Sequence, residues 1–450
     1  MSDNLLQKHN DMVEQLKADL VGNTQRLKVK KKTVSNLFRY TGRAPLPSRT
    51  VDLSSFNQPL HLNKATKTLD VQGLTTYEDI VNFILPLGFL PTITPELKHI
   101  TIGGATVGIG IETNSYRYGF VHDGLIEAEV LLPDGRVVVC SASSDYSDLF
   151  WGLPNSYGTL GYILRVKIKV RAVKRNVHLH TKRFDDPTKF LRSMKAAAAE
   201  PLNDYVESLI YSKNELYLTT SRETNKASGL KSIYGGTVFY KEISRPGDLF
   251  LSTKDYIFRY DPEWFWAIPE TPFYRLFRRF SPSKYRNSAF YTHYVAWQTK
   301  LSSKLPFYNF EDESLELLIQ DWEVVWEQAD KLLRFALSTF DLDGRPLMAA
   351  PLRTFAPATS YPMQKNKLYF NLGSYSYVKK KVGKPPFYNT KTMDDFCFSQ
   401  GGIKMLYSSS FLNKAEFGKI YGGESYINLK QKYDPKGLAP TLFEKVVRAH

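Results

Sequence analysis

Hydrophobic residues near the start of the chain recur at steps of three and four positions, which predicts an amphipathic helix over residues 1–28. Residues 29–95 alternate short strand-like runs with a helix beginning near Thr75, which precedes Glu78 at capping-box spacing. Residues 124–140 predict two strands joined by a Pro-Asp-Gly turn. The apolar face of the first helix comprises Leu5, Leu6, Met12, Val13, Leu16 and Leu20.

The pattern changes character along the rest of the chain. Residues 96–175 combine a glycine-rich run with the hairpin and end in a strand of alternating residues over 161–170. From about 176 to 395 helix and strand patterns mix, and residues 396–450 add further strand and helix patterns. A chain of 450 residues is long enough for two domains, each with its own core.

Glycines are concentrated in the run TIGGATVGIGIET, residues 101–113. Because glycine lacks Cβ and tolerates positive φ, backbone N–H groups in such a run can close around a bulky anion such as a diphosphate. The run lacks the Gly-Lys-Ser/Thr of a Walker loop, and its spacing departs from the Rossmann fingerprint. It therefore indicates a dinucleotide site in another fold, with an ordinary turn between strands as the alternative.

Further segments follow this run in a fixed order. They are the pair Tyr118-Gly119, the hairpin with its Asp-Gly turn, DLFWG at residues 148–152, and GTLGY at residues 158–162. Together they resemble the second FAD-binding subdomain of the p-cresol methylhydroxylase and vanillyl-alcohol oxidase superfamily. The resemblance implies an α+β protein, in which a two-subdomain FAD-binding fold of the p-cresol methylhydroxylase type is followed by an α/β substrate (cap) domain.

The resemblance narrows to two groups of lipid reductases. Segments at 101–119, 205–212, 319–321, 368–373 and 402–417 are similar to delta-24 sterol reductases. Segments at 35–39, 70–79 and 432–435 are similar to bacterial flavoenzymes that reduce 10-methylene fatty-acyl chains. The implied domains are an N-terminal helix (1–28), an FAD-binding domain (29–175), a substrate domain (176–395) and a C-terminal segment closing on the flavin (396–450).

The resemblance also implies FAD held by two loops without a covalent bond. The first loop, residues 32–39, has neither the His nor the Cys that attaches flavin in this superfamily; its alternative is an ordinary polar loop. His99 is expected to be structural or exposed. Glu112 is assigned to the cofactor, with a catalytic role as the alternative. The expected FAD-binding residues are Thr33, Ser35, Asn36, Thr101, Ile102, Gly103, Gly104, Ala105, Thr106, Val107, Gly108, Ile109, Gly110, Ile111, Glu112, Thr113, Ser115, Gly119, Gly158, Thr159 and Gly161.

Reduction of an isolated alkene, which the resemblance implies, sets chemical requirements. An unpolarised double bond must first be protonated on its less substituted carbon, so that hydride from reduced flavin can add to the resulting tertiary cation. This order needs an acid and a dry pocket. NADPH is expected as co-substrate, and no metal site is expected. Family position favours Gln320, Asp321, Lys404 and Tyr407 as catalytic residues, with Glu323, His293 and Tyr369 as further candidate donors.

Composition bears on partners and location. The net charge of +15 comes from scattered Lys and Arg, and no nucleic-acid module accompanies it, so we expect a lipid substrate and no nucleic acid. An anionic membrane surface would suit this charge, with a solvated basic surface as the alternative. Only Cys140 and Cys397 are present, and residues 1–32 lack an apolar run of spanning length. We expect a cytoplasmic protein, with peripheral membrane association and oligomeric state left open.

Residues 256–291 interleave aromatic and basic side chains, among them Trp264, Trp266, Phe273, Phe280 and Arg275–Arg279. Trp and Tyr beside Arg suit a membrane interface, which predicts a lipid-facing lip at the substrate mouth. The alternative is a core helix pair with an exposed basic face.

Two other functions stay open on sequence alone. One is an oxidase or dehydrogenase of a hydroxy acid, sugar or alcohol, because a fold does not fix a function. The other is a non-catalytic lipid-binding protein that keeps a flavin fold. A pocket rich in Arg or His would favour the first, and a flavin that NADPH cannot reduce would favour the second.

Overall fold

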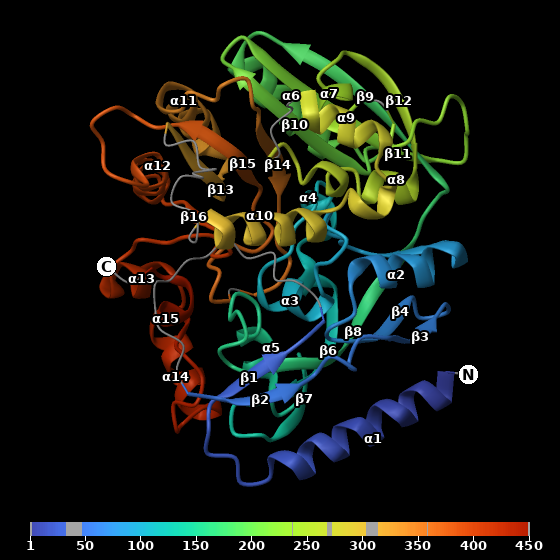
Figure 1. Cartoon of the computed structure of the whole chain (residues 1–450), viewed down its shortest axis with the longest axis vertical. Helices are drawn as coiled ribbons and strands as arrows, with labels where there is room; N and C mark the ends of the chain where they lie inside the picture. The colour runs from blue at the N-terminus through green and yellow to red at the C-terminus, as the bar shows by residue number, and fades with distance from the viewer. Residues whose placement is uncertain are drawn as a thin grey trace.

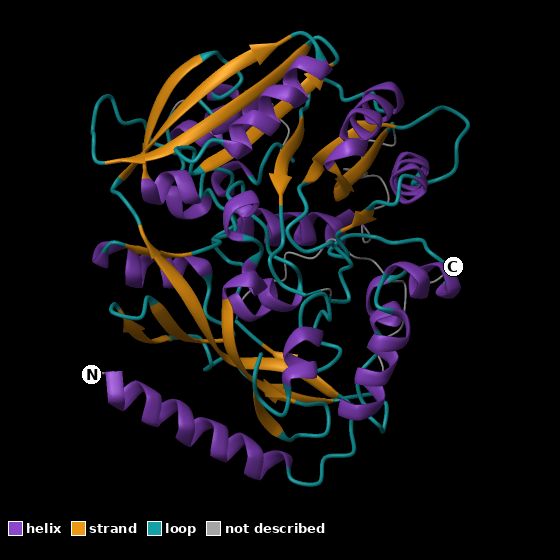
Figure 2. Ribbon diagram, turned by 180° about the vertical axis from the view of Figure 1, so that it is seen from behind, coloured by secondary structure: helices purple, strands orange, loops and turns teal. Residues whose placement is uncertain are grey.

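The computed structural model describes residues 2–32, 47–235, 237–267, 272–302, 314–357 and 359–448. Two large sheets organise these residues, one in the lower half and one in the upper half of Figure 1. The N-terminal helix lies beneath the lower half, and the C-terminal helices run along one side of the molecule (Figures 1 and 2).

The lower half contains a six-stranded antiparallel sheet of order β3-β4-β8-β6-β7, with β5 also paired to β8. The alternating run expected at 161–170 is its long central strand β8, and the expected hairpin is formed by β6 and β7. A separate parallel pair joins β1 (Leu27–Lys30) and β2 (Arg49–Asp52). The six strands are β3 (Pro59–Asn63), β4 (Thr68–Gln72), β5 (Phe89–Pro91), β6 (Leu125–Leu131), β7 (Val137–Ser141) and β8 (Tyr162–Ala172).

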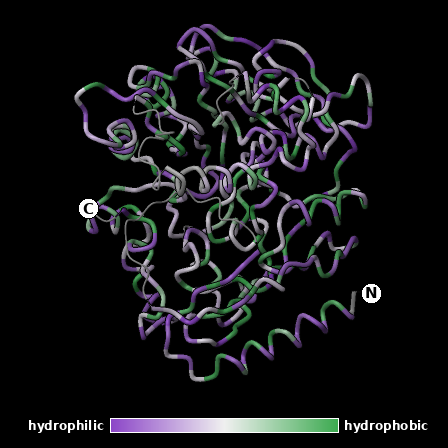
Figure 3. Tube along the Cα trace, in the orientation of Figure 1, coloured by the Kyte–Doolittle hydropathy of each residue, from purple (hydrophilic) through white to green (hydrophobic). Residues whose placement is uncertain are grey.

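The first helix, α1 (Ser2–Leu20), is shorter than the predicted 1–28. Gly22 adopts a φ of 68°, and the chain re-enters as β1 at Leu27. Hydrophobic and hydrophilic residues alternate along α1 in Figure 3, and its Leu16 and Leu20 pack in a cluster with Leu27. The amphipathic helix is therefore confirmed, with a corrected end.

The second helix, α2 (Tyr77–Ile84), begins one residue later than expected. Its N-cap is Thr76, whose hydroxyl accepts a hydrogen bond from the Asp79 backbone N–H at 3.1 Å, rather than Thr75 acting with Glu78. A β-region Ncap with a side-chain acceptor satisfies one of the donors that every helix start leaves free.

The upper half contains an eight-stranded sheet of order β12-β9-β11-β10-β14-β15-β13-β16, whose pairs are all antiparallel. The expected α/β arrangement of residues 176–395 is therefore corrected to α+β, because helices pack on an antiparallel sheet. The strands are β9 (Asn176–Phe184), β10 (Tyr205–Ser212), β11 (Glu215–Thr224), β12 (Gly247–Ser252), β13 (Leu315–Val325), β14 (Leu347–Leu352), β15 (Tyr369–Lys379) and β16 (Ile403–Lys404).

Helices α6 (Pro187–Ala199), α11 (Ala329–Thr339) and α12 (Tyr388–Ser399) pack against the large sheet, where Phe190, Leu332 and Trp322 share one buried cluster. No helix in the described ranges is both long and apolar enough to span a bilayer. The remaining helices are α3 (Ile102–Val107), α4 (Ser115–Tyr118), α5 (Ser147–Gly152), α7 (Phe239–Glu242), α8 (Thr253–Ile257), α9 (Pro272–Phe280), α10 (Ser288–Ser302), α13 (Lys414–Ile420), α14 (Gly423–Tyr433) and α15 (Leu442–Val446), with short 3₁₀ turns η1 (Leu85–Leu87), η2 (Val121–Gly124), η3 (Asp261–Glu263), η4 (Ser283–Tyr285) and η5 (Trp326–Gln328).

Candidate functional site

A cavity of about 1390 Å³ is lined by residues from both halves of the molecule. Its walls come from β1, the glycine-rich segment, the start of β8, strands β13 and β15, and the chain after β16 and before α15. The volume exceeds the roughly 300–1,000 Å³ of ordinary small-molecule sites, so it has room for a large cofactor and a second molecule.

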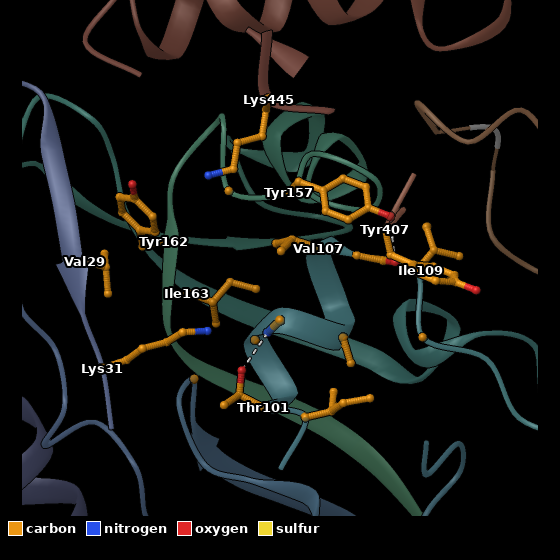
Figure 4. A pocket seen from close by; sticks show the side chains of 18 of the residues that line it. Val29, Lys31, Thr101, Val107, Ile109, Tyr157, Tyr162, Ile163, Tyr407 and Lys445 are labelled. Atoms are coloured by element: carbon orange, nitrogen blue, oxygen red, sulfur yellow. Dashed lines mark hydrogen bonds between the residues drawn. The ribbon is translucent and has the colours of Figure 1, made fainter. Parts of the chain in front are cut away.

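The glycine-rich segment forms one wall of this cavity as the short helix α3 rather than as a loop. Its N-cap Thr101 accepts a hydrogen bond from the Gly104 N–H at 3.3 Å, which Figure 4 marks with a dashed line. A Cβ on Gly103 would lie 2.7 Å from the Gly73 carbonyl oxygen, so this glycine permits packing against the sheet. Gly104 is exposed towards the cavity, where a Cβ would meet only the Thr101 hydroxyl at 2.9 Å.

Four bulky residues that line the cavity adopt left-handed backbone conformations. Their φ angles are 57° at Ile109, 49° at Tyr157, 47° at Trp264 and 59° at Phe265. Such conformations cost on the order of 1–3 kcal/mol each and persist where the surroundings over-determine them, as at ligand sites. Because all four residues surround one cavity, this cavity is the candidate ligand-binding site.

Positive charge gathers at one part of the cavity. Figure 4 shows the ammonium groups of Lys31 and Lys445 pointing into it from two sides. Surrounding protein lowers the pKa of Lys31, although its side chain remains accessible from the cavity. Arg26 and Lys28 add to the same lining. A diphosphate would find both cations and backbone here.

The opposite part of the cavity is organised by the buried carboxyl group of Asp321 on β13. It accepts hydrogen bonds from Asn371 Nδ2 at 2.9 Å, Tyr375 Oη at 2.7 Å and Tyr407 Oη at 2.8 Å. Burial raises the pKa of Asp321, and the three donors oppose that rise. Burial and the Asp321 charge hold the pKa of both tyrosines well above the ordinary value.

Aromatic rings close this end of the cavity. Phe265 stacks on Tyr375 with ring centroids 4.2 Å apart and planes at 15°, and Trp264 lines the cavity beside it. Trp264 is 9% exposed and Trp266 3%, so the predicted lip is wrong for these two residues, which belong to the core. The side chain of Phe273 lies outside the described residues.

Most of the predicted site residues that the structure describes come together here, but several do not. Glu112 and Thr113 bond to the buried Arg259, and Ser115 accepts from the Glu112 N–H at 3.0 Å. The predicted site residues that do line the cavity are Thr101, Gly103, Gly104, Ala105, Val107, Gly108, Ile109, Gly110, Ile111, Gly158, Gly161, Asp321 and Tyr407.

Other predicted cofactor residues play local structural parts. Ile102 is buried in the core, and the Thr106 hydroxyl donates to its carbonyl at 2.8 Å. Thr159 donates to the Ser156 carbonyl at 2.7 Å. A Cβ on Gly119, whose φ is 79°, would lie 2.2 Å from the Asp123 carboxylate. The predicted first-loop residues Thr33, Ser35 and Asn36 lie outside the described residues.

Two predicted catalytic residues lie beside the cavity rather than in its lining. Gln320 donates to the backbone carbonyls of Asp321 and Met405, both at 2.8 Å, and so fixes the chain that carries Tyr407. Lys404 is fully buried and pairs with Asp394 at 2.6 Å. Three further residues were candidate proton donors. Glu323 accepts a hydrogen bond from Tyr361, and Tyr369 accepts one from the Gln364 N–H and donates to no described cavity group. His293 is exposed on α10.

Sequence reasoning missed several lining residues. Lys31 lies in a basic cluster that the sequence displays, but nothing local ties that cluster to the glycine-rich segment. Glu96, Tyr375 and the stretch from Leu438 to Lys445 reach the cavity only through the tertiary fold. His99, expected to be structural or exposed, is partly exposed and also lines the cavity.

The residues present fit FAD. An elongated cofactor with a diphosphate in its middle needs close backbone approach, which the exposed face of Gly104 permits, and nearby cations such as Lys31 and Lys445. The flavin end needs a largely apolar enclosure with few polar groups, which the Asp321 end provides.

Known proteins support this assignment. Residues 29–141 match an FAD binding domain family. Over 411 residues the chain is 26% identical to the Delta(24)-sterol reductase of Homo sapiens, covering 87% of this chain and 76% of the human protein. It is 23% identical over 444 residues to the Delta(24)-sterol reductase of Pisum sativum, covering 88% and 76%. A shorter likeness, 23% over 197 residues, reaches Cytokinin dehydrogenase 7 of Oryza sativa subsp. japonica, covering 40% of this chain and 37% of that protein.

The sequence match and the cavity coincide, because the matched range contains the end of β1 and the whole of α3. The likeness to the sterol reductases extends over most of the chain, beyond the matched domain. The chain is therefore an FAD-dependent oxidoreductase with an α+β fold, built on an FAD binding domain and related over most of its length to the Delta(24)-sterol reductases.

Proposed function

We propose that the protein reduces an isolated carbon–carbon double bond of a lipid, with NADPH as the electron donor. The observation that carries this proposal is the cluster of Asp321, Tyr375 and Tyr407, which lies in the same cavity as the glycine-rich segment and beside stacked aromatic rings. Bound FAD would supply the hydride at this end of the cavity.

The lining favours an apolar substrate over a hydroxy acid or sugar. Around Asp321 the cavity is walled by Ile319, Met405, Trp264 and Phe265, which offer little hydrogen bonding to a polar molecule. The relatives named as Delta(24)-sterol reductases make a sterol side chain the first substrate to test. A methylene-bearing fatty-acyl chain, which also presents an unactivated alkene, is the second.

The chain's own groups suit a reaction that passes through positive charge. The enclosed apolar wall excludes water that would otherwise capture a cation. The Asp321 carboxylate, bonded to Tyr375, would supply negative charge near a developing cation at this end of the cavity. The hydrogen bonds from Asn371, Tyr375 and Tyr407 orient that carboxylate.

We further propose that FAD is bound without a covalent link and that two subdomains hold it. The pair β1–β2 and the six-stranded sheet are the candidates for these subdomains, since both contribute to the cavity wall. Within the described lining His99 is the one histidine and there is no cysteine. Acid precipitation should release all flavin into the supernatant; flavin that stays in the pellet would point to His99 or to another attachment.

Anaerobic titration tests the proposed function. NADPH should bleach the bound flavin, and a sterol with a Δ24 double bond or a 10-methylene acyl lipid should restore the oxidised spectrum, with the reduced lipid identified by mass spectrometry. Asp321→Asn should keep FAD and reduction by NADPH while slowing reoxidation by lipid at least tenfold. Bleaching by a hydroxy acid, sugar or alcohol in place of NADPH would instead establish the dehydrogenase alternative.

We also propose peripheral contact with an anionic membrane through an exposed face of α9 and α10. Phe280 is 72% and Trp297 56% exposed, and Arg275 and Arg279 are exposed on the same helix as Phe280. Apolar rings flanked by arginines combine insertion with attraction to anionic head groups. The lipid-facing lip predicted from the sequence included Trp264 and Trp266, which are buried. The exposed residues Phe280, Trp297, Arg275 and Arg279 take that role in the present proposal.

A further inference from the structure

Three carboxyl groups surround one buried guanidinium group beside the cavity. Arg259 Nη2 lies 2.9 Å from Glu112 Oε1 and 3.7 Å from Glu96 Oε1, and Arg259 Nε lies 3.1 Å from Glu207 Oε1. The side chains of Arg259, Glu112 and Glu207 are essentially inaccessible to solvent. One positive charge cannot balance three buried negative charges, so the cluster must hold at least one proton on a carboxyl group.

Hydrogen bonding distinguishes the three carboxyl groups. Glu207 accepts from Tyr260 Oη at 2.6 Å and from Tyr256 Oη at 3.2 Å in addition to Arg259. Glu112 accepts from the backbone N–H and the hydroxyl of Thr113, at 2.6 and 2.7 Å. Glu96 has the longer contact to Arg259 and a hydrogen bond from its own backbone N–H. Donors stabilise the ionised form, and Glu112 and Glu207 receive more of them than Glu96 does, although burial also raises the pKa of Glu207. Glu96 is therefore the candidate holder of the proton.

The titration of Glu96 agrees with this assignment. Burial first, and then the charge of Glu112, raise the pKa of Glu96 well above its usual value, while the guanidinium of Arg259 opposes the rise. The groups that face it are Arg259, Glu112, Glu207 and its own backbone N–H, and Glu96 in its ionised form would raise the pKa of the Tyr375 phenol. The raised pKa therefore favours the protonated form of Glu96.

Glu96 is also the member of the cluster that reaches the cavity. Its side chain is 14% exposed and lines the same cavity as Asp321, Tyr375 and Phe265. Burial raises the pKa of both groups, but three donors oppose the rise at Asp321, whereas two further carboxyl groups add to the rise at Glu96. Two carboxyl groups whose surroundings separate their proton affinities are the usual mark of an acid and an electrostatic partner.

We propose that Glu96 is the acid that protonates the substrate alkene, an inference that rests on the proposed function. The O–H bond of Glu96 breaks, and a C–H bond forms at the less substituted alkene carbon from the π electron pair. The carboxylate that remains is stabilised by Arg259, and the adjacent carbon receives the hydride that originates in NADPH. A proton from water then restores Glu96.

Glu96→Gln tests the proposal, because it keeps the shape and removes the acid. The variant should retain FAD and reduction by NADPH, while reoxidation by the alkene falls at least about 10²-fold, the scale of general acid catalysis. Glu96→Asp, which keeps an acid on a shorter side chain, should recover part of that rate. The infrared difference spectrum of wild type minus Glu96→Gln at neutral pH should contain a band of a protonated carboxylic acid, since other buried acids such as Glu323 contribute equally to both proteins.

The Glu112→Gln variant tests the role of Glu96 through the pH dependence of reoxidation. A purely structural role for Glu96 predicts no change in that pH dependence. Removing the Glu112 charge frees Arg259 and removes repulsion, so the pKa of Glu96 falls. The alkaline limb of the reoxidation rate, where Glu96 loses its proton, should then shift to lower pH in Glu112→Gln and disappear in Glu96→Gln. If Glu96→Gln does not bind FAD, this shift and the infrared band decide the proposal.

The possible outcomes distinguish failure of the role of Glu96 from failure of the proposed function. Two results in a wild-type protein that reduces alkenes would overturn the role of Glu96 alone: a Glu96→Gln variant that reoxidises at the wild-type rate, or a difference spectrum without a protonated carboxylic-acid band. A wild-type protein whose NADPH-reduced flavin transfers hydride to no lipid alkene overturns the proposed function, and the role of Glu96 with it.

Discussion

At the residue scale, Gly103 and Gly104 are neighbours with different tasks. A side chain on Gly104 would enter the cavity, so Gly104→Val should abolish or strongly weaken FAD binding while the apoprotein stays folded. A side chain on Gly103 would meet the Gly73 carbonyl oxygen at 2.7 Å, so Gly103→Val should destabilise the fold by at least about 1–3 kcal/mol. Flavin fluorescence titration and denaturant unfolding measure the two effects; full flavin occupancy in Gly104→Val would refute the assignment.

The sequence predicts such residues unevenly. The glycine-rich run can be recognised locally because its function depends on backbone access, which glycine itself provides. Glu112, in the same run, was assigned to the cofactor, yet it bonds to Arg259, which lies 147 residues away in the sequence. Glu96 carries no local signal either, because its proton depends on partners that only the tertiary fold assembles.

The protonation of Glu96 also predicts how stability depends on pH. Its pKa is raised above the ordinary value of 4.5, so below that value both folded and unfolded chains hold the proton. As pH rises, the unfolded chain ionises first, and the free energy of unfolding falls by up to about 1.4 kcal/mol per pH unit until the folded pKa is reached. In Glu96→Gln the side chain does not ionise, so this decrease in the free energy of unfolding does not occur.

The measurement is urea unfolding of wild type and Glu96→Gln across a series of pH values. The stability of the variant relative to wild type should increase with pH above about 4.5 and then level off. A difference that stays constant over the whole range would mean that Glu96 is ionised in the folded protein.

At the element scale, periodicity predicted α1, the β6–β7 hairpin and β8, because each has one buried face. It did not predict α3, since a six-residue helix with two glycines has no apolar stripe and depends on the Thr101 cap and on packing against Gly73. It also could not tell which aromatic residues of 256–291 are exposed, because core and interface use the same side chains.

Helices α9 and α10 allow a paired test of the membrane proposal. Phe280→Ser with Trp297→Ser should leave thermal stability and NADPH oxidation intact but reduce binding to anionic vesicles, because both rings are largely exposed. Trp266→Ala, at 3% exposure, should instead destabilise the fold by about 3–5 kcal/mol. Vesicle co-sedimentation at low and high salt checks the first effect, and unchanged binding of the double variant would exclude this surface.

At the scale of the whole molecule, the cavity is assembled from segments that are far apart in sequence, from Arg26 on the N-terminal side to Lys445 in α15. The general order of the chain, with an FAD binding domain first and the residues of the apolar end later, could be predicted from resemblance. Resemblance predicted only that the C-terminal segment would close on the flavin. It did not predict that the stretch between Leu438 and Lys445 reaches the cavity, because those contacts depend on the complete tertiary fold.

This construction predicts that FAD stabilises the molecule as a unit. The native state binds the cofactor, whereas an unfolded chain cannot bring Lys31, Gly104 and Lys445 together. Stability should therefore rise by RT ln(1 + [L]/Kd), about 2.7 kcal/mol at 100 times Kd and a further 1.4 kcal/mol for each tenfold increase in free FAD. Thermal unfolding of the apoprotein at increasing FAD concentration measures this stabilisation. Gly104→Val is the matched control, because its side chain would enter the cavity, and its melting temperature should not depend on FAD. A melting temperature independent of FAD in the wild type would mean that the cofactor does not bind where both halves meet.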